Sequence, residues 1–222
     1  IFNFFSVFAQ EDNPEKLFKT KYPVINFHHH FGFGGKFSAE DVFKYELKAM
    51  DAAGIVATAN LNAGFGNVFE EWVKVKEKYP DRIILFVNQD YGAEKSSSGN
   101  FVIGKKLDDP KYPEEIARYL EYQRSKGAQA VKIYKTLGLY LKDTKGNYIR
   151  VDDKRFYPYW DKAGELGMPV LIHTADPISF FVKMGYNNFR YPKVRPEWDF
   201  SKTWGMSGFN QLITELINVV AD

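Results

Sequence analysis

The sequence predicts an α/β fold in which a parallel sheet curls into a TIM-type (β/α) barrel, of which about the first five β/α units are present. Three observations support this prediction. Short apolar runs alternate five times with amphipathic segments of helical spacing. The short runs are almost continuously apolar, as expected for strands that are covered on both faces. No run is followed by a G-x-G-x-x-G or P-loop motif, so a doubly wound nucleotide-binding sheet has little support.

The strands are predicted from short runs that are rich in β-branched and aromatic residues and bounded by Gly or Pro. The first run follows Pro23 and ends before a glycine-rich turn, and the second follows Gly54. The third is almost wholly apolar at its start, the fourth follows Gly127, and the fifth begins at Pro169. The five strands are expected at residues 24–30, 55–61, 82–89, 128–134 and 169–173.

The helices are predicted from apolar spacing and from residues that begin or end helices. Ser38 is a candidate N-cap, with Asp41 three residues later, and Pro113 suits a first helical turn. Gly54, Gly127 and Gly167 each follow a helical pattern, as is usual at a C-terminal cap. The helices are expected at residues 38–53, 68–79, 113–125, 156–166 and 209–221.

The chain is expected to be a fragment of a longer barrel. A complete barrel has eight units and about 250 residues. This chain has 222 residues, begins without Met and ends on a predicted helix. We therefore expect one barrel domain over residues 20–222 that stops before a sixth strand. A complete, open five-stranded sheet is the alternative.

Composition excludes several classes of function. The 30 basic residues nearly balance the 28 acidic ones, which gives no support for a nucleic-acid partner. The absence of cysteine excludes disulfides, thiolate metal sites and cysteine nucleophiles. No apolar run approaches the roughly 18 residues that span a bilayer, so no membrane span is expected. The expected partner is a small-molecule substrate. The sequence is also compatible with a homo-oligomer.

The first ten residues, IFNFFSVFAQ, differ from the rest of the chain. Seven of them are apolar, and Val7-x-Ala9 suits the small-residue positions before a signal peptidase cut. We expect residues 1–10 to be the end of a secretory signal, which predicts a periplasmic or secreted protein. The alternative is an apolar segment packed on the domain of a cytoplasmic protein.

Two long segments interrupt the alternation of strands and helices. Residues 90–113 follow the third predicted strand, and residues 174–208 follow the fifth. Both leave the carboxyl ends of strands, where barrels of this kind build their sites. They are expected to be either a substrate lid or surface segments packed by their own aromatic side chains.

All four histidines lie at the ends of predicted strands. Because side chains alternate in a strand, His28 and His30 share one face, while His29 shares the other with Ile25 and Phe27. The second face is expected to pack against outer helices. By the same alternation, His173 faces inward. Three imidazoles would then meet at one end of the barrel, and they suit one divalent ion, zinc or manganese.

Three segments resemble the amidohydrolase superfamily. Residues 24–31, VINFHHHF, resemble its D-x-H-x-H first strand, with Asn26 in place of Asp. Residues 131–135, VKIYK, resemble its fourth strand, and residues 169–176, PVLIHTAD, resemble its fifth. The resemblance implies a metal-dependent enzyme with His28, His30 and His173 as metal ligands.

The resemblance also suggests roles for Lys132 and Asp176, which are the candidate catalytic residues. Lys132 stands where many members carry a carboxylated lysine that bridges two metals. The motifs most resemble a branch that uses one metal, which favours a lysine that pairs with a carboxylate or with the substrate. The sixth-strand histidine and the eighth-strand aspartate, the family's general base, have no counterpart in this sequence, so the chain as given is expected to lack the proton-transfer step.

Polar residues after the predicted strands are candidates for substrate contacts or for contacts that support the ligands. They are equally expected as ordinary loop residues that cap helices. The candidate substrate-binding residues are Asn60, Asn88, Asp90 and Lys135, with Asn62 beside them.

Three functions remain open. The first is hydrolysis of an amide, ester or lactone, in which the metal activates a water and polarises the carbonyl. The second, from the same branch, is decarboxylation or hydration of a small organic acid, which the basic residues Lys132, Lys135 and Arg190 would favour. The third is a non-catalytic or inactive fragment with open sheet edges.

Overall fold

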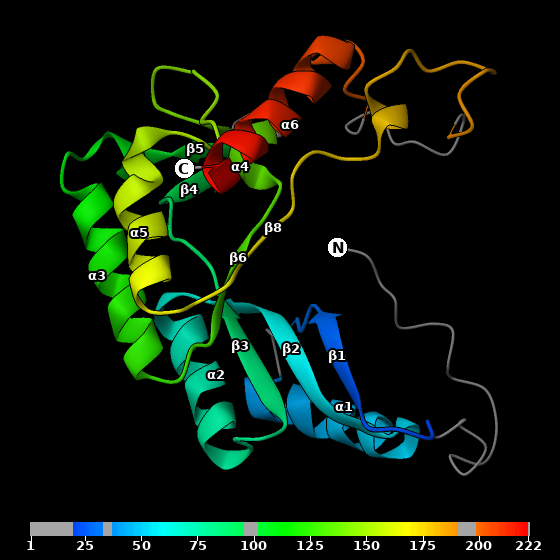
Figure 1. The fold of residues 1–222 in the computed structure, drawn as a ribbon, viewed down its shortest axis with the longest axis vertical. Helices are drawn as coiled ribbons and strands as arrows, with labels where there is room; N and C mark the ends of the chain where they lie inside the picture. The colour runs from blue at the N-terminus through cyan, green and yellow to red at the C-terminus, as the bar shows by residue number, and fades with distance from the viewer. Residues whose placement is uncertain (1–19, 33–36, 96–101, 191–198, 222) are drawn as a thin grey trace.

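The fold is built on one curled, five-stranded parallel sheet, seen in the computed structural model (Figure 1). The structure describes residues 20–32, 37–95, 102–190 and 199–221. The strand order in the sheet is β1-β2-β3-β6-β8, and each neighbouring pair is parallel. The chain therefore adds each strand on the same side of the last. This order is that of a half-barrel, whereas a doubly wound sheet reverses direction at its middle.

The predicted strands and helices are all present. The strands of the sheet are β1 (Val24–His29), β2 (Ile55–Gly64), β3 (Ile83–Val87), β6 (Ala130–Ile133) and β8 (Val170–Ile172). The long helices are α1 (Ala39–Ala53), α2 (Gly66–Lys78), α3 (Tyr112–Ser125), α5 (Tyr157–Glu165) and α6 (Gly205–Ala221). None of these helices is long and apolar enough to cross a membrane within the described ranges.

Helix α1 shows how local chemistry fixes the bounds of an element. The Ser38 hydroxyl accepts a hydrogen bond from the Asp41 amide at 3.1 Å, and the Asp41 carboxylate accepts one from the Ser38 amide at 3.2 Å. This reciprocal pair satisfies two amides that the first turn would leave without partners. Gly54 ends the helix at φ 75°, a conformation that glycine adopts without a steric penalty.

A second, small sheet was not predicted. It joins β4 (Ala93–Lys95), β5 (Val102–Gly104) and β7 (Leu141–Lys142), so part of the predicted loop at 90–113 is strand. Strands of two or three residues are too short to show a period-two pattern. Their pairing also joins segments about forty positions apart, which no local signal predicts.

The described part of the segment at 174–208 packs inward through its aromatic residues. Phe180, Phe181 and Phe200 are buried together with Leu212 of α6. The rings of Phe181 and Phe200 lie 5.2 Å apart. This contact favours the interpretation that the segment is packed by its own aromatic side chains. The proposed signal segment at 1–10 lies outside the described residues.

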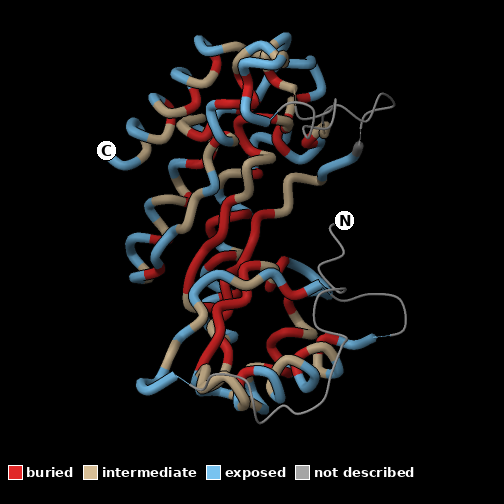
Figure 2. Tube along the Cα trace, turned by 90° about the vertical axis from the view of Figure 1, so that its right-hand side faces the viewer, coloured by how far each residue is buried: buried red, intermediate tan, exposed pale blue. Residues whose placement is uncertain are grey.

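The sheet has a different apolar cluster on each face. The larger cluster lies between the sheet and the helices and includes Trp72, Leu85 and Val131. The smaller cluster covers the concave face, with Leu61 and Phe86 at its centre. In Figure 2 the buried residues run as a continuous band along the strands. In β3, for example, Leu85 and Val87 face the helices, whereas Phe86 faces the concave side.

The side chain of Asn88 joins three strands at their carboxyl ends. Its Nδ2 donates to the carbonyl oxygens of Leu61, at 3.2 Å, and Lys132, at 3.1 Å. Its Oδ1 accepts a hydrogen bond from the Gly64 amide at 2.9 Å. Asn88 is buried, so none of these backbone groups can exchange this partner for bulk water. Asn88 thus holds β2, β3 and β6 in register where the polar side chains begin.

Replacement of Asn88 by Leu is expected to lower the free energy of unfolding by about 2–4 kcal/mol, because it removes three hydrogen bonds to buried backbone groups. Urea unfolding of the full chain measures this change. The matched control is Asn67→Leu on the exposed start of α2, for which a change within about 0.5 kcal/mol is expected. Equal midpoints for the two variants would show that Asn88 does not stabilise the sheet.

Candidate metal centre

Strand β1 brings two imidazoles together at its carboxyl end. The Nε2 atoms of His28 and His30 lie 3.2 Å apart, and the two rings meet edge to face with centroids 5.1 Å apart. Both side chains are exposed on this edge strand. The expectation that these two histidines point the same way is met by this geometry.

The prediction of which way Phe27 and Ile25 face on β1 is wrong. Phe27 was expected to share the face of His29, but its ring packs against Phe86 of the concave cluster at 5.5 Å. Ile25 was expected to be covered by outer helices, but 54% of it is exposed. The physical reason is that β1 shifts register against β2 between Val24 and Ile25 and again between Asn26 and His29, which breaks strict alternation.

His29 turns away from its two neighbours. Its Nε2 lies 3.9 Å from the Glu46 carboxylate on α1, and its ring is 4.2 Å from that of Phe31. Burial lowers the pKa of His29, an effect that the charge of Glu46 opposes. The middle histidine therefore belongs to the contact between the sheet and α1.

His173 follows β8, and its amide donates to the Ile133 carbonyl at 2.9 Å. Burial, then the charges of Lys132 and Lys135, lower the pKa of His173, and His28 adds to the same effect. Burial, then His30 and Lys132, lower the pKa of His28. The candidate ligands therefore share one electrostatic environment. Nevertheless, within the described part of the chain no three His, Asp or Glu side chains lie close enough to hold an ion together.

Lys132 is a buried cation on the concave face. Only 2% of the residue is exposed, and its Nζ lies 5.7 Å from the centre of the Tyr134 ring. Burial lowers the pKa of Lys132. Among the residues that the structure describes, no carboxylate lies within ion-pair distance of its Nζ. A buried ammonium without a counter-ion is costly, so this position is suited to an anionic ligand.

Lys135 and Asp176 form an ion pair beside His173. The Lys135 Nζ lies 2.9 Å from Oδ1 and 2.8 Å from Oδ2 of Asp176, whose side chain is 7% exposed. Ala175, next to Asp176, has φ 59° and is the one non-glycine residue with positive φ in the described ranges. The turn after β8 is thus held in an unusual conformation that places Asp176 against Lys135.

The predicted substrate-binding residues separate into different environments. Asn60 is fully buried, and its Oδ1 accepts from the Asn62 amide at 2.8 Å. Asn88 donates to backbone groups, as described above. Asp90 accepts from the Gly92 amide at 2.9 Å and pairs with Lys106. Lys135 lies beside the candidate ligand His173, and Asn62 contacts the candidate ligand His30.

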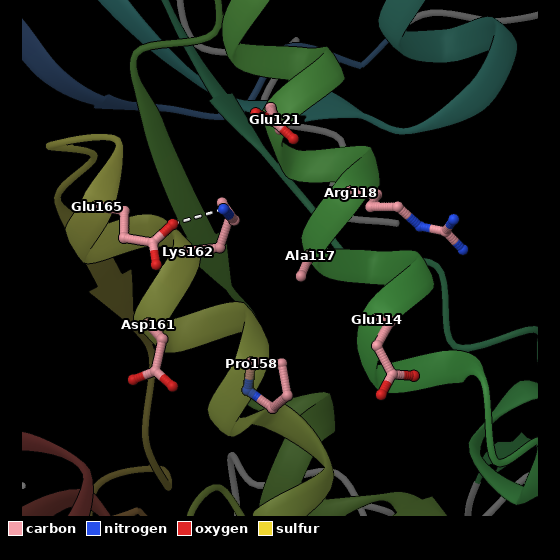
Figure 3. Close-up of a pocket in the computed structure, with 8 residues that line it drawn as sticks. All are labelled: Glu114, Ala117, Arg118, Glu121, Pro158, Asp161, Lys162 and Glu165. Carbon is pink, nitrogen blue, oxygen red and sulfur yellow. Dashed lines mark hydrogen bonds and ion pairs between the residues drawn. The ribbon is translucent and has the colours of Figure 1, made fainter.

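Asp90 borders a cavity of about 370 Å³ on the helix side of the sheet, whose lining includes Tyr112 and Tyr119 of α3. A second hollow lies between α3 and α5, as Figure 3 shows, and is lined mainly by charged residues. Lys162 and Glu165 form an ion pair there. Neither lining contains a histidine, so the two hollows are separate from the imidazole cluster.

Sequence reasoning missed Tyr134. Its hydroxyl donates to the Leu61 carbonyl at 2.7 Å and also contacts Asn62 Oδ1. Asn62 Oδ1 in turn lies 2.7 Å from His30 Nδ1. The signal was available, because Tyr134 follows Lys132 by two positions and period-two alternation places both on one face.

Among known proteins, the chain is similar to several solved structures. No protein-family model and no curated protein matches the chain. A "putative amidohydrolase" from Staphylococcus aureus is 15% identical, with a TM-score of 0.47, over 90% of this chain and 62% of that one. A 2,6-dihydroxybenzoate decarboxylase from Rhizobium is 16% identical, with a TM-score of 0.47, over 89% of this chain and 60% of that one.

A 2,6-dihydroxybenzoate decarboxylase in complex with 2,6-dihydroxybenzoate is 14% identical, with a TM-score of 0.49, over 89% of this chain and 61% of that one. The chain thus spans about three fifths of the length of these solved proteins, 60–62% of each.

Replacement of Lys135 by Met is expected to lower the free energy of unfolding by about 1–3 kcal/mol, because it leaves the buried Asp176 carboxylate without its cation. Lys106→Met is the control, since its pair with Asp90 is more exposed and is expected to contribute less than about 1 kcal/mol. Urea unfolding at neutral pH compares the two. A larger loss for Lys106→Met would contradict the assignment of Lys135–Asp176 as the structural pair.

Proposed function

We propose that this chain carries the metal-binding end of a metal-dependent hydrolase that acts on an amide, ester or lactone carbonyl. The observation that carries the proposal is the 3.2 Å separation of the Nε2 atoms of His28 and His30. Zinc–nitrogen bonds of about 2.0–2.1 Å at a tetrahedral angle place two ligand nitrogens about 3.3 Å apart. The two imidazoles are therefore spaced as neighbouring ligands of one ion.

The chemistry of the donor set fits a divalent first-row ion, zinc or manganese. Imidazole binds such ions only in its neutral form. The lowered pKa values of His28 and His173 favour that form at neutral pH. In this proposal His28, His30 and His173 hold the ion, which would polarise the substrate carbonyl and lower the pKa of a water.

Other side chains of the chain have supporting roles in the proposal. Asp176 holds the Lys135 ammonium in place beside His173, and Lys132 offers a positive charge from the concave face. Lys132 would attract negative charge on the substrate. The buried position of Lys132 strengthens this attraction, because fewer water molecules screen it.

The metal-binding proposal predicts a difference between adjacent histidines. The full chain is expected to bind about one zinc ion, and the His28→Ala/His30→Ala variant is expected to lose at least 100-fold in affinity. His29→Ala is the matched control and is expected to bind like the parent, because His29 faces Glu46. Isothermal titration with zinc and with manganese measures both. A folded parent chain that takes up neither ion would overturn the proposal.

A second candidate function is decarboxylation of a small organic acid, and Lys132 is the observation that favours it. A carboxylate substrate would neutralise this buried cation, whereas an amide or ester would leave it unpaired. A solved structure similar to this chain is a decarboxylase in complex with 2,6-dihydroxybenzoate. That acid is therefore a suitable probe for the concave face.

Lys132→Met separates the two candidates. If the substrate is an acid, the variant is expected to bind 2,6-dihydroxybenzoate about 10- to 100-fold more weakly, as the loss of a charge-assisted hydrogen bond predicts. The uncharged 2,6-dihydroxybenzamide is the control ligand, and its affinity is expected to stay the same. Equal binding of the acid by parent and variant would exclude Lys132 as its partner and would favour the hydrolase.

A further inference from the structure

A hydrogen-bonded chain of side chains leads from β6 through β2 to one of the proposed ligands. His30 Nδ1 lies 2.7 Å from Asn62 Oδ1, and the Tyr134 hydroxyl shares its one proton between this oxygen and the Leu61 carbonyl. The hydroxyl is also 2.7 Å from the Leu61 carbonyl, which anchors the phenol to β2. The rings of Tyr134 and His30 lie 5.9 Å apart at an angle of 33°. His30 is thus contacted on the side of its ring away from His28.

The identity of the atoms fixes the direction of the hydrogen bond. An amide oxygen can only accept, so the proton between His30 and Asn62 must lie on Nδ1 of His30. A neutral imidazole carries one proton, so Nε2 then keeps its lone pair. That lone pair points toward His28, where the proposed ion would lie.

Tyr134 keeps the Asn62 oxygen in this role. The Tyr134 phenol is a hydrogen-bond donor in its ordinary protonated form, and its hydroxyl lies within hydrogen-bond distance of both Asn62 Oδ1 and the Leu61 carbonyl. The hydroxyl therefore has a proton to donate to Asn62 Oδ1 or to the Leu61 carbonyl. If the amide were reversed, Asn62 Nδ2 would donate to His30 Nδ1 and would leave the proton on Nε2, which blocks metal binding. The two orientations give opposite tautomers.

We propose that Asn62 and Tyr134 are positioning residues that hold His30 with its proton on Nδ1 and present an unprotonated Nε2 to the metal. The metal part of this inference rests on the proposed function, whereas the tautomer is a property of the metal-free chain. Residues behind metal ligands commonly fix the tautomer in this way, and their loss weakens metal affinity by about 10- to 100-fold.

The consequence for the metal-free chain is specific. With a bare Nε2 on His30, the 3.2 Å contact requires His28 to donate from its own Nε2. Binding of an ion then requires only His28 to change tautomer, because His30 already carries its proton on Nδ1 and has a free Nε2. One of the two paired ligands is thus prepared before the ion arrives.

The test uses three variants of the full chain. Asn62→Leu removes the acceptor while keeping the shape of the side chain. Asn62→Asp keeps only acceptors and cannot donate, so it should preserve the tautomer. Tyr134→Phe removes the hydroxyl that contacts Asn62 Oδ1. Two measurements are made on each: the tautomer of His30 by long-range ¹H–¹⁵N correlation without metal, and zinc affinity by isothermal titration.

In the parent and in Asn62→Asp, we expect His30 to carry a proton on Nδ1. In Asn62→Asp we expect a zinc affinity at least as high as that of the parent, because a carboxylate behind His30 raises the basicity of the ligand. In Asn62→Leu we expect a shift toward Nε2–H and about 10- to 100-fold weaker binding. Tyr134→Phe should shift the tautomer in the same direction by a smaller amount. The His29 signals serve as an internal control and should not change.

The Nε2–H tautomer in the parent chain would overturn the proposal, because the amide would then be reversed. An Asn62→Leu chain that is folded by circular dichroism and keeps both the tautomer and the affinity would also overturn it. A parent with the Nδ1–H tautomer that binds no zinc would refute the metal-dependent function while leaving the positioning of His30 confirmed. The two hypotheses therefore fail in distinguishable ways.

Discussion

The junction that Asn88 makes between three parallel strands determines where the candidate site lies. Its amide binds the carbonyls of Leu61 and Lys132 and the amide of Gly64, at the points where β2 and β6 end. Asn62 follows directly after Leu61, and Tyr134 lies two residues beyond Lys132. The contact between Tyr134 and Asn62 therefore requires that these two strands keep the register that Asn88 fixes. Any shift of one strand by a residue would reverse which side chains face inward.

The concave face combines an apolar surface with a concentration of positive charge. Leu61, Phe86 and Ala130 provide the apolar part, and the buried Lys132 provides the charge. Lys135 contributes a further cation, which Asp176 neutralises in part. Burial lowers the pKa values of the nearby His28 and His173, and the charge of Lys132 adds to this effect. The same charge would attract an anion to the place where His28 and His30 meet. Electrostatics thus link the proposed metal site with the proposal of a substrate that carries or develops negative charge.

The main elements of the fold could be predicted because their signals are local. The strands and long helices follow from apolar periodicity and from residues such as Ser38 and Gly54. The orientation of Phe27 could not be predicted, because it depends on a register shift between β1 and β2 that alternation ignores. The position of Asp90 was equally inaccessible, because a loop residue has no period and its pairing with Lys106 depends on the unpredicted second sheet nearby. The spacing of two predicted that His28 and His30 share a face, but their close contact depends on the irregularity of β1 and on Asn62, which no local pattern shows. The position of His173 relative to this pair depends on the curvature of the whole sheet.

The geometry of β1 explains why two of the proposed ligands, His28 and His30, lie together whereas His173 depends on the rest of the sheet. Residues two apart in a strand are separated by about 6.6 Å along the chain, so parallel side chains would hold their rings well apart. The Nε2 atoms of His28 and His30 nevertheless lie 3.2 Å from one another, because the strand is irregular where these residues emerge and Asn62 fixes one of the rings. His173 lies at the far edge of the sheet, four strands away in the order β1-β2-β3-β6-β8, so its approach depends on how tightly the sheet curls. The local pair is thus set by one strand and its neighbour, whereas the approach of His173 is set by the curvature of the whole sheet. In the proposed metal site, His173 would therefore join His28 and His30 only through that curvature.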